Sequence, residues 1–596
     1  MLYKFTKSLS YRNALFIITA VLFFSCQKTL DYENSTGSIL PPDLSTKISS
    51  TVSGFVTDEN DLAVMGATVF VGSTTITTDK YGYFEARNVQ VVKEAAVVTV
   101  NKTGYFKGIK TYTATEGKSA FFRIKLIPKI IAGTVNAASG GSVTLSNGMI
   151  VKLNPGTIVN ASSNTQYNGS VNVAAYWISP AAADLNKIMP GDLRGINTEG
   201  SLKLLQTYGM AAVELTGSSG ELLQIVNGQK ATLTFPIPSS LTSTAPASIP
   251  LWYFDETNGL WKQEGSATKT GSTYVGDVGH FSYWNCDFPF PNAVNFDCTV
   301  IDAANHPVMA ANVEVYFSNG QYTGCHGLTD SSGYISGRIP ANSQLVIKVF
   351  TTTNACPVYS QAFTTTNSNI SFGNFTIGSI NSASVSGNLT NCSNQPVTNG
   401  YVMMYLNSQF YRYNANSSGA FSFSTPICGT TNIANFIGGD VTTSQEGSLN
   451  NYSLVSGNNN IGNIMACGSS NQEFVNYTVN GTPYTIALPG GTVTQQFDSS
   501  ALNSIVVTGF DYSIPIYTTF GFSKTGITSG SVQNLTFFTS QQTGNTTIPT
   551  PISVNITEYG SVGQFISGNF NGNVTGVASP NNTYAVTGNF RVRRNY

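Results

Sequence analysis

The chain has 596 residues, more than one hydrophobic core supports, and about five domains are expected from its length. Its 29 Lys and Arg balance 30 Asp and Glu, and charged residues make up only 10% of the sequence, so nucleic acid is not an expected partner. The sequence contains 57 Gly, 35 Phe and 29 Tyr, and apolar residues alternate with polar ones instead of recurring at helical spacing. We therefore predict an all-β fold of tandem β-sandwich modules in a multidomain chain.

Residues 1–26 have the features of a secretory signal. Three basic residues precede a short apolar run: Lys4, Lys7, Arg12 and residues 14–24. That run is too short for a membrane-spanning helix, which needs about 20 apolar residues. Ser25 and Cys26 resemble the end of a bacterial lipobox, although Phe23 and Phe24 depart from its usual start. The resemblance implies that Cys26 is lipidated and anchors the protein in a membrane; the alternative is a plain signal peptide with a chance cysteine.

The residues after Cys26 concern the location of the protein. Gln27, Lys28, Asp31 and Glu33 resemble the Lys-plus-acidic export signal of surface-exposed lipoproteins from Bacteroidota. The resemblance implies an outer-membrane lipoprotein facing the cell exterior. Residues 27–50 are polar and contain two prolines, which is typical of a tether.

A repeat of strand, turn, strand, turn, strand occurs three times, in residues 51–130, 292–380 and 381–469. Each copy contains a four-residue step that opens with Asp or Asn and ends with Gly: 79–82, 330–333 and 416–419. The first side chain can bond the backbone of its own turn, and the glycine accepts a positive φ. The steps therefore predict turns between strands.

These three segments resemble the carboxypeptidase regulatory-like family, transthyretin-like β-sandwiches grouped with carbohydrate-binding-like folds. In that family the sandwich accompanies a separate zinc peptidase domain, and the sequence contains no such domain. The resemblance therefore implies a structural or binding role.

The segment 131–291 lies between the first and second copies and holds the four tryptophans Trp177, Trp252, Trp261 and Trp284. Residues 148–158, 231–238 and 280–284 together resemble the β-domain shared by zonula-occludens proteins and uncoordinated-type netrin receptors. Some relatives of that domain cut themselves at a His-Phe-Ser step, which occurs here as His280, Phe281 and Ser282. In that hypothesis His280 takes the hydroxyl proton of Ser282, whose oxygen attacks the Phe281 carbonyl. The alternative is that Phe281 closes a core and His280 makes an ordinary hydrogen bond.

The last segment, residues 470–596, contains no cysteine and few charges. Residues 566–572 and 586–593 have similar sequences and predict two antiparallel neighbouring strands. We expect a C-terminal β-domain.

Few residues suit catalysis or metal binding. Seven cysteines follow Cys26, all between Cys286 and Cys467, in an odd number that leaves at least one thiol free or paired between chains. There is no CxxC pair and no HExxH motif, so neither a metal nor a cofactor is expected. His306 and His326 are predicted to be surface histidines without a role.

The sequence thus predicts a non-catalytic, lipid-anchored surface protein that acts in binding, adhesion or as a scaffold. Its expected partners are the membrane and an extracellular glycan or protein. One alternative is an autoproteolytic surface protein that cleaves between Phe281 and Ser282. Another is a glycan-capture lipoprotein whose Tyr and Trp side chains stack on sugars, as opposed to aromatic residues that fill sandwich cores.

Overall fold

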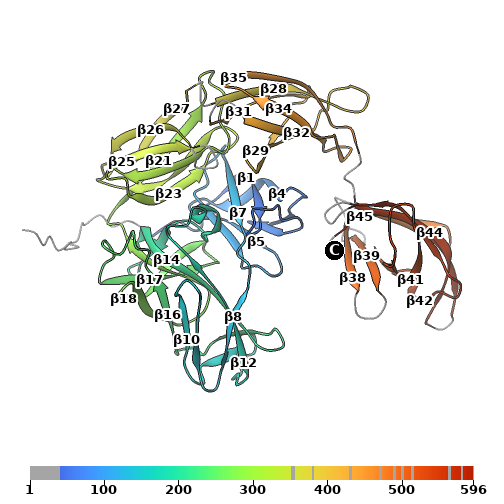
Figure 1. The fold of residues 1–596 in the computed structure, drawn as a ribbon, viewed down its shortest axis with the longest axis horizontal. Helices are drawn as coiled ribbons and strands as arrows, with labels where there is room; N and C mark the ends of the chain where they lie inside the picture. Colours follow the sequence, from blue (N-terminus) through green and yellow to red (C-terminus); the bar gives the residue numbers. More distant parts are fainter. Residues whose placement is uncertain are drawn as a thin grey trace, which may run out of the picture.

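The computed structural model describes residues 41–596 except 351–355, 379–381, 429–431, 469–472, 488–490, 499–502, 512–515, 561–564, 579–580 and 595–596. The predicted signal, Cys26 and most of the predicted tether lie outside the described residues. Almost all regular secondary structure of the described chain is β-strand, arranged in several separate sheets, which confirms the predicted all-β, sandwich-like fold (Figure 1). No helix among the described residues has the length and apolar character needed to span a bilayer.

The first sandwich begins at Lys47, inside the segment predicted as a tether. In one sheet β1 lies between β4, antiparallel to it, and β7, parallel to it; the other sheet has the order β3-β2-β5-β6. Alternate residues of β1 and β5 are buried, as expected for strands with one face on a core. The strands are β1 (Lys47–Thr57), β2 (Thr68–Val71), β3 (Thr74–Thr77), β4 (Tyr83–Val92), β5 (Ala96–Asn101), β6 (Gly108–Tyr112) and β7 (Ser119–Lys125).

The second sandwich has the same topology. Its first strand, β21, pairs antiparallel with β24 and parallel with β27, and the facing strands follow the order β23-β22-β25-β26. The strands are β21 (Ala293–Ile301), β22 (Asn312–Phe317), β23 (Tyr322–Leu328), β24 (Tyr334–Pro340), β25 (Gln344–Phe350), β26 (Pro357–Thr364) and β27 (Ile370–Thr376).

The third sandwich repeats this topology again, with β28 between β31 and β35 and a second sheet of β30, β29 and β32 to which β33 and β34 add. The strands are β28 (Ser382–Thr390), β29 (Gly400–Leu406), β30 (Gln409–Asn414), β31 (Ala420–Pro426), β32 (Asn432–Asp440), β33 (Gln445–Glu446), β34 (Asn450–Leu454) and β35 (Gly457–Met465). The three sequence repeats therefore correspond to three copies of one strand arrangement.

The repeated turn has the chemistry that its sequence predicts. The Oδ1 atom of Asp79 accepts hydrogen bonds from the backbone N–H groups two and four residues further on, and so do those of Asp330 and Asn416. Gly82 has a φ of 72°, and a Cβ built on it would overlap the carbonyl oxygen of Val56. Only glycine fits this close approach of two strands.

An earlier turn in each copy uses the same side-chain chemistry. The Oδ1 atoms of Asp58, Asp302 and Asn391 also accept N–H groups two and four residues further on. The repeat thus extends to a second turn that closes the first strand of each copy.

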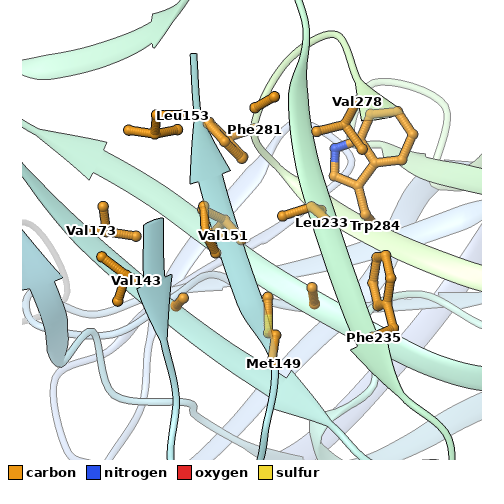
Figure 2. Close-up of a cluster of buried hydrophobic side chains, with 14 of the residues drawn as sticks. Val143, Met149, Val151, Leu153, Val173, Leu233, Phe235, Val278, Phe281 and Trp284 are labelled. Carbon is orange, nitrogen blue, oxygen red and sulfur yellow. The ribbon is translucent and has the colours of Figure 1, made fainter. Parts of the chain in front are cut away.

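The central domain, which lies between the first and second sandwiches in the sequence, is a single large sheet system. Its apolar core, part of which Figure 2 shows, gathers side chains from β9, β10, β12, β14, β16 and β19. The elements are β8 (Ile131–Asn136), β9 (Gly141–Thr144), β10 (Ile150–Leu153), β11 (Ile158–Asn160), β12 (Ser170–Ile178), α2 (Leu185–Ile188), β13 (Arg194–Ile196), β14 (Leu202–Thr216), β15 (Leu222–Ile225), β16 (Ala231–Pro236), β17 (Ser248–Asp255), β18 (Leu260–Thr270), β19 (Thr273–Val278) and β20 (Tyr283–Pro289).

The C-terminal domain has a core of its own, formed by side chains between residues 475 and 592. The predicted strand pair is confirmed, because β44 and β45 are antiparallel with Ile566 opposite Val592. The strands are β36 (Phe474–Val479), β37 (Thr482–Ala487), β38 (Gly491–Asp498), β39 (Ser504–Asp511), β40 (Ile516–Ser523), β41 (Val532–Ser540), β42 (Gly544–Thr547), β43 (Ser553–Tyr559), β44 (Phe565–Gly576) and β45 (Thr583–Arg593).

Candidate functional site

The first sandwich is the hub of the assembly, because it makes buried contacts with each of three other domains. Against the third sandwich it contributes four aromatic side chains to a shared apolar cluster: Phe55, Tyr81, Tyr83 and Phe121. Their partners in that cluster include Tyr401, Tyr411 and Tyr413. Two domains that are more than 250 residues apart in the sequence therefore share one core.

Arg123 of β7 lies inside this shared cluster. Its Nη2 atom donates a hydrogen bond to the carbonyl oxygen of Phe410 at 2.9 Å. Its guanidinium lies 4.8 Å from the ring centre of Tyr411 and 5.3 Å from that of Phe55. Burial lowers the pKa of Arg123. The charge is stabilised by ring faces and a carbonyl, and these contacts join the first and third sandwiches.

Glu446 forms the second polar contact between the first and third sandwiches. Its carboxylate accepts hydrogen bonds from the hydroxyls of Tyr81 at 3.0 Å and Tyr401 at 2.6 Å, and it forms an ion pair with Lys80. Burial and the charge of Glu446 raise the pKa of Tyr81 well above its usual value. Arg412 lies over the ring of Tyr401, 3.8 Å from its centre. The cluster holds a buried carboxylate with hydrogen bonds and an ion pair, as buried charges require.

The first sandwich also contacts the second. Phe121 of β7 pairs with Leu328 of β23, which makes the two sheets continuous. Beside this pair the buried carboxylate of Asp330 accepts hydrogen bonds from the N–H and hydroxyl of Ser119, at 3.0 and 3.1 Å. Asp330 thus accepts hydrogen bonds from its own turn with Oδ1 and from Ser119 of the first sandwich with Oδ2.

The contact with the central domain is polar as well. Lys110 of β6 donates hydrogen bonds to the carbonyl oxygens of Asn186 and Met189. The hydroxyl of Tyr283 donates to the carbonyl of Lys107 at 2.8 Å. The first sandwich is therefore tied by hydrogen bonds to the central domain as well as to the second and third sandwiches.

His280, Phe281 and Ser282 lie directly before β20. The hydroxyl oxygen of Ser282 is 3.5 Å from Nδ1 of His280 and 3.2 Å from the carbonyl oxygen of Tyr283. Gln224 accepts a hydrogen bond from the N–H of Phe281 at 2.7 Å and donates one to its carbonyl at 3.1 Å. Burial lowers the pKa of His280, which favours the neutral ring that a general base requires. The structure thus places the base His280 beside the hydroxyl of Ser282, and Gln224 polarises the carbonyl of Phe281.

The same residues have structural contacts. Phe281 and Trp284 belong to the apolar core of the central domain, and Figure 2 shows both rings among its aliphatic side chains. The ring of His280 lies between Tyr253 and Trp284, with ring centres 4.7 and 5.1 Å away. None of the three residues is among the described residues with positive φ, so their φ angles show no backbone strain.

The tryptophans do not form an exposed surface. Trp252, Trp261 and Trp284 are fully buried, and each donates its indole N–H to a backbone carbonyl. Trp177 packs half-buried against the central core. These rings fill cores, as aromatic residues in alternating strands do, and in this arrangement the three buried rings cannot stack on a sugar.

Four of the described cysteines form disulfides, one of which joins two domains. Cys356 of the second sandwich is bonded to Cys428 of the third, and Cys392 is bonded to Cys467 within the third. The remaining described cysteines, Cys286, Cys298 and Cys325, are buried and free. In the described part of the chain, no three His, Cys, Asp or Glu side chains gather as a metal ion requires.

The prediction of surface positions holds for His306 and is wrong for His326. The side chain of His306 is 42% exposed and lies 3.2 Å from Asp302. His326 is half-buried in β23, where its Nδ1 atom is 2.9 Å from the hydroxyl of Tyr322, and burial together with the nearby Lys110 lowers its pKa to about 4. The residues around His326 in the sequence do not indicate its burial, because the first sandwich, which covers β23, is a different domain.

No family model and no curated protein matches the chain. Similar solved structures include the Bacillus anthracis TIE protein, 9% identical, with 71% of this chain and 50% of that chain covered and a TM-score of 0.14. A shaft pilin of Lactobacillus rhamnosus GG is 10% identical over 30% of this chain and 99% of the pilin, with a TM-score of 0.17. The major pilin subunit of Bacillus cereus is 11% identical over 55% and 99%, at 0.12. The chain spans about half the length of the TIE protein, and TM-scores this low support no inference about function.

Proposed function

We propose that the protein is a non-catalytic, lipid-anchored cell-surface component that acts as a binding, adhesion or scaffold module. The hub carries this proposal. One sandwich buries charged and aromatic side chains against three other domains, and a disulfide joins two of those domains. Such contacts favour a single rigid body over a chain of domains that move independently. The reason is that interfaces between freely moving domains are smaller and bury less surface. A stiff body suits a protein that presents a surface to a partner.

The anchor in this proposal rests on the sequence. Cys26 would carry the lipid, and residues 27–42 would tether the body, with a reach of at most about 60 Å when fully extended, because Asp43 already donates its N–H to Glu94 of the first sandwich. The expected location is the outer membrane, with the body facing the cell exterior. The expected partner is an extracellular glycan or protein, and nothing in the charge balance favours nucleic acid.

Metabolic labelling with a fatty-acid analogue tests the anchor. The wild-type protein should carry the label and stay with the membranes, and Cys26→Ala should lose the label and be released. Protease treatment of intact cells tests the orientation separately, because only a surface-exposed body is degraded without lysis. An unlabelled wild-type protein, or a body degraded only after lysis, would contradict the corresponding part of the proposal.

A second candidate function is self-cleavage between Phe281 and Ser282, favoured by the alignment of His280, Ser282 and Gln224. His280 would take the hydroxyl proton of Ser282, and the oxygen would attack the Phe281 carbonyl, which Gln224 polarises. The peptide C–N bond would break as the ester forms, and the nitrogen of Ser282 would take up the proton. Water would then open the ester to a carboxylate on Phe281 and restore the hydroxyl.

A further inference from the structure

A cavity of about 190 Å³ lies where the first sandwich, the central domain and the second sandwich meet. Its walls come from β6 and β7, from residues 186–194 and from β22, β23 and β24. An engineered protein cavity of about 150 Å³ holds benzene, so this space is sufficient for a compact ligand of a few non-hydrogen atoms. His280, Phe281, Ser282 and Gln224 are not among its described lining residues.

The charges on the described wall are mostly of one sign. The basic side chains that line the cavity are Lys110, Lys118, Arg123, Lys187, Arg194 and Arg338. Asp192 is the acidic residue of the described lining, and it binds Nε of Arg194 at 2.7 Å. Lys187 lies 3.8 Å from Asp61, which neutralises part of its charge. An excess of positive charge remains, and in a partly enclosed site such an excess attracts anions.

Three arginines on this wall have a buried nitrogen without a hydrogen-bond partner among the described residues, and in Arg123 that nitrogen is Nε. Arg194 is 5% exposed, and its Nη2 atom has no hydrogen-bond partner among the described residues. Arg338 donates from Nη2 to the carbonyl of Ala293, but its buried Nε atom has no such partner. Burial and repulsion by Arg194 lower the pKa of Arg338. Buried donors are almost always paired, so three unpaired arginine nitrogens in one basic cavity point to a ligand that accepts hydrogen bonds.

We propose that this cavity binds a small oxyanion of the phosphate or sulfate class, held by Arg194 and Arg338 with Lys110 beside them. The planar donor forks of arginine match the spacing of oxygen atoms in such anions and bind them with short, charge-assisted hydrogen bonds. Because walls of three domains meet at the cavity, the anion would bridge them and stabilise the assembled body.

Inorganic phosphate is the probe, added to the purified chain (residues 27–596) at constant ionic strength set with sodium chloride. Isothermal titration calorimetry should show saturable binding of one equivalent. The melting temperature should rise to a plateau with phosphate concentration, because a ligand that binds only the folded state stabilises it. Phosphate also stabilises proteins non-specifically by exclusion from their surface, but that effect grows steadily and reaches no plateau.

Arg338→Gln should weaken phosphate binding about tenfold or more, since a charge-assisted hydrogen bond is lost, and Arg338→Lys should restore part of the affinity. The matched control is Arg87→Gln, because Arg87 is an exposed arginine of the first sandwich that pairs with Glu85. It should bind like the wild type. Lys118→Gln provides a second variant at the cavity wall if Arg338→Gln does not fold.

Equal affinities in the wild type, Arg338→Gln and Lys118→Gln would overturn the proposal, and so would the absence of saturable heat with the wild type. Sulfate should compete with phosphate. Failure of sulfate to displace phosphate would contradict the assignment to this ligand class.

Discussion

The hydroxyl of Tyr81 donates a hydrogen bond of 3.0 Å to Glu446, although the two residues are 365 positions apart in the sequence. Tyr81 belongs to the repeated turn of the first sandwich, and Glu446 lies in β33 of the third. The bond places a side chain of one repeat inside the polar cluster of another. It therefore reports directly on whether the two sandwiches are docked.

A double-mutant cycle measures this contact. Tyr81→Phe should lower the free energy of unfolding of the docked body by about 1 kcal/mol, and Glu446→Gln should lower it by about 1–3 kcal/mol because Lys80 loses its partner. The two effects should fall short of additivity by at least about 0.5 kcal/mol, as read from urea unfolding. Tyr274→Phe is the control, since its hydroxyl bonds Pro246 in the central domain. Its effect should add fully to that of Glu446→Gln.

The repeated glycine gives a second prediction. Gly82 and Gly117 have φ values of 72° and 71°, but only at Gly82 would a Cβ meet other atoms. Gly117→Ala should therefore destabilise the protein by about 1–2 kcal/mol through its left-handed backbone alone. Gly82→Ala should add about 1–3 kcal/mol for the overlap with Val56. Equal urea midpoints for the two variants would show that this strand approach relaxes freely.

The turns are the part of the fold that local sequence specifies. Asp79 and its counterparts bond their own backbone, so the four-residue step suffices to predict the turn between two strands. The docking of the sandwiches depends on side chains such as Arg123 and Tyr411, which belong to different repeats and have no local pattern. The sequence therefore predicted the modules and not the hub that joins them.

The lack of a local sequence pattern also explains which features of the candidate site residues could not be predicted. The sequence predicts His326 at the surface because it follows Cys325 in an expected loop, but the residue lies in β23 and another domain covers it. The disulfide between Cys356 and Cys428 crosses from one repeat to the next, and spacing alone does not select it. The order of His280, Phe281 and Ser282 was visible in the sequence, whereas Gln224, which holds Phe281 by both of its backbone groups, lies in another strand.

His326 predicts a pH dependence. Its pKa is about 4 in the folded protein, below the usual value of 6.5, so the unfolded chain binds the proton first as the pH falls. The stabilisation is complete above pH 6.5 and is lost between pH 6.5 and 4, by up to about 3 kcal/mol. His326→Gln should remove this part of the slope in urea unfolding at several pH values. Parallel profiles for the two proteins would contradict the assignment, whereas buried carboxylates such as Asp192 affect both alike.

Self-cleavage between Phe281 and Ser282 is tested on a denaturing gel. Because its φ angles show no strain and Phe281 is held in the core, the scaffold account expects one intact chain after prolonged incubation of purified protein. Ser282→Ala should then migrate identically. A pair of fragments ending at Phe281 and beginning at Ser282, identified by mass spectrometry and lost in Ser282→Ala, would establish self-cleavage instead.

Differential scanning calorimetry of the purified chain tests the central claim that the first sandwich unites the body. The account predicts one cooperative transition for residues 41–468 and a separate one for the C-terminal domain. Arg123→Met should lower the melting temperature of the whole larger transition, because Arg123 joins the first and third sandwiches. Independent melting of the sandwiches and the central domain, with Arg123→Met shifting only the first sandwich, would contradict the account.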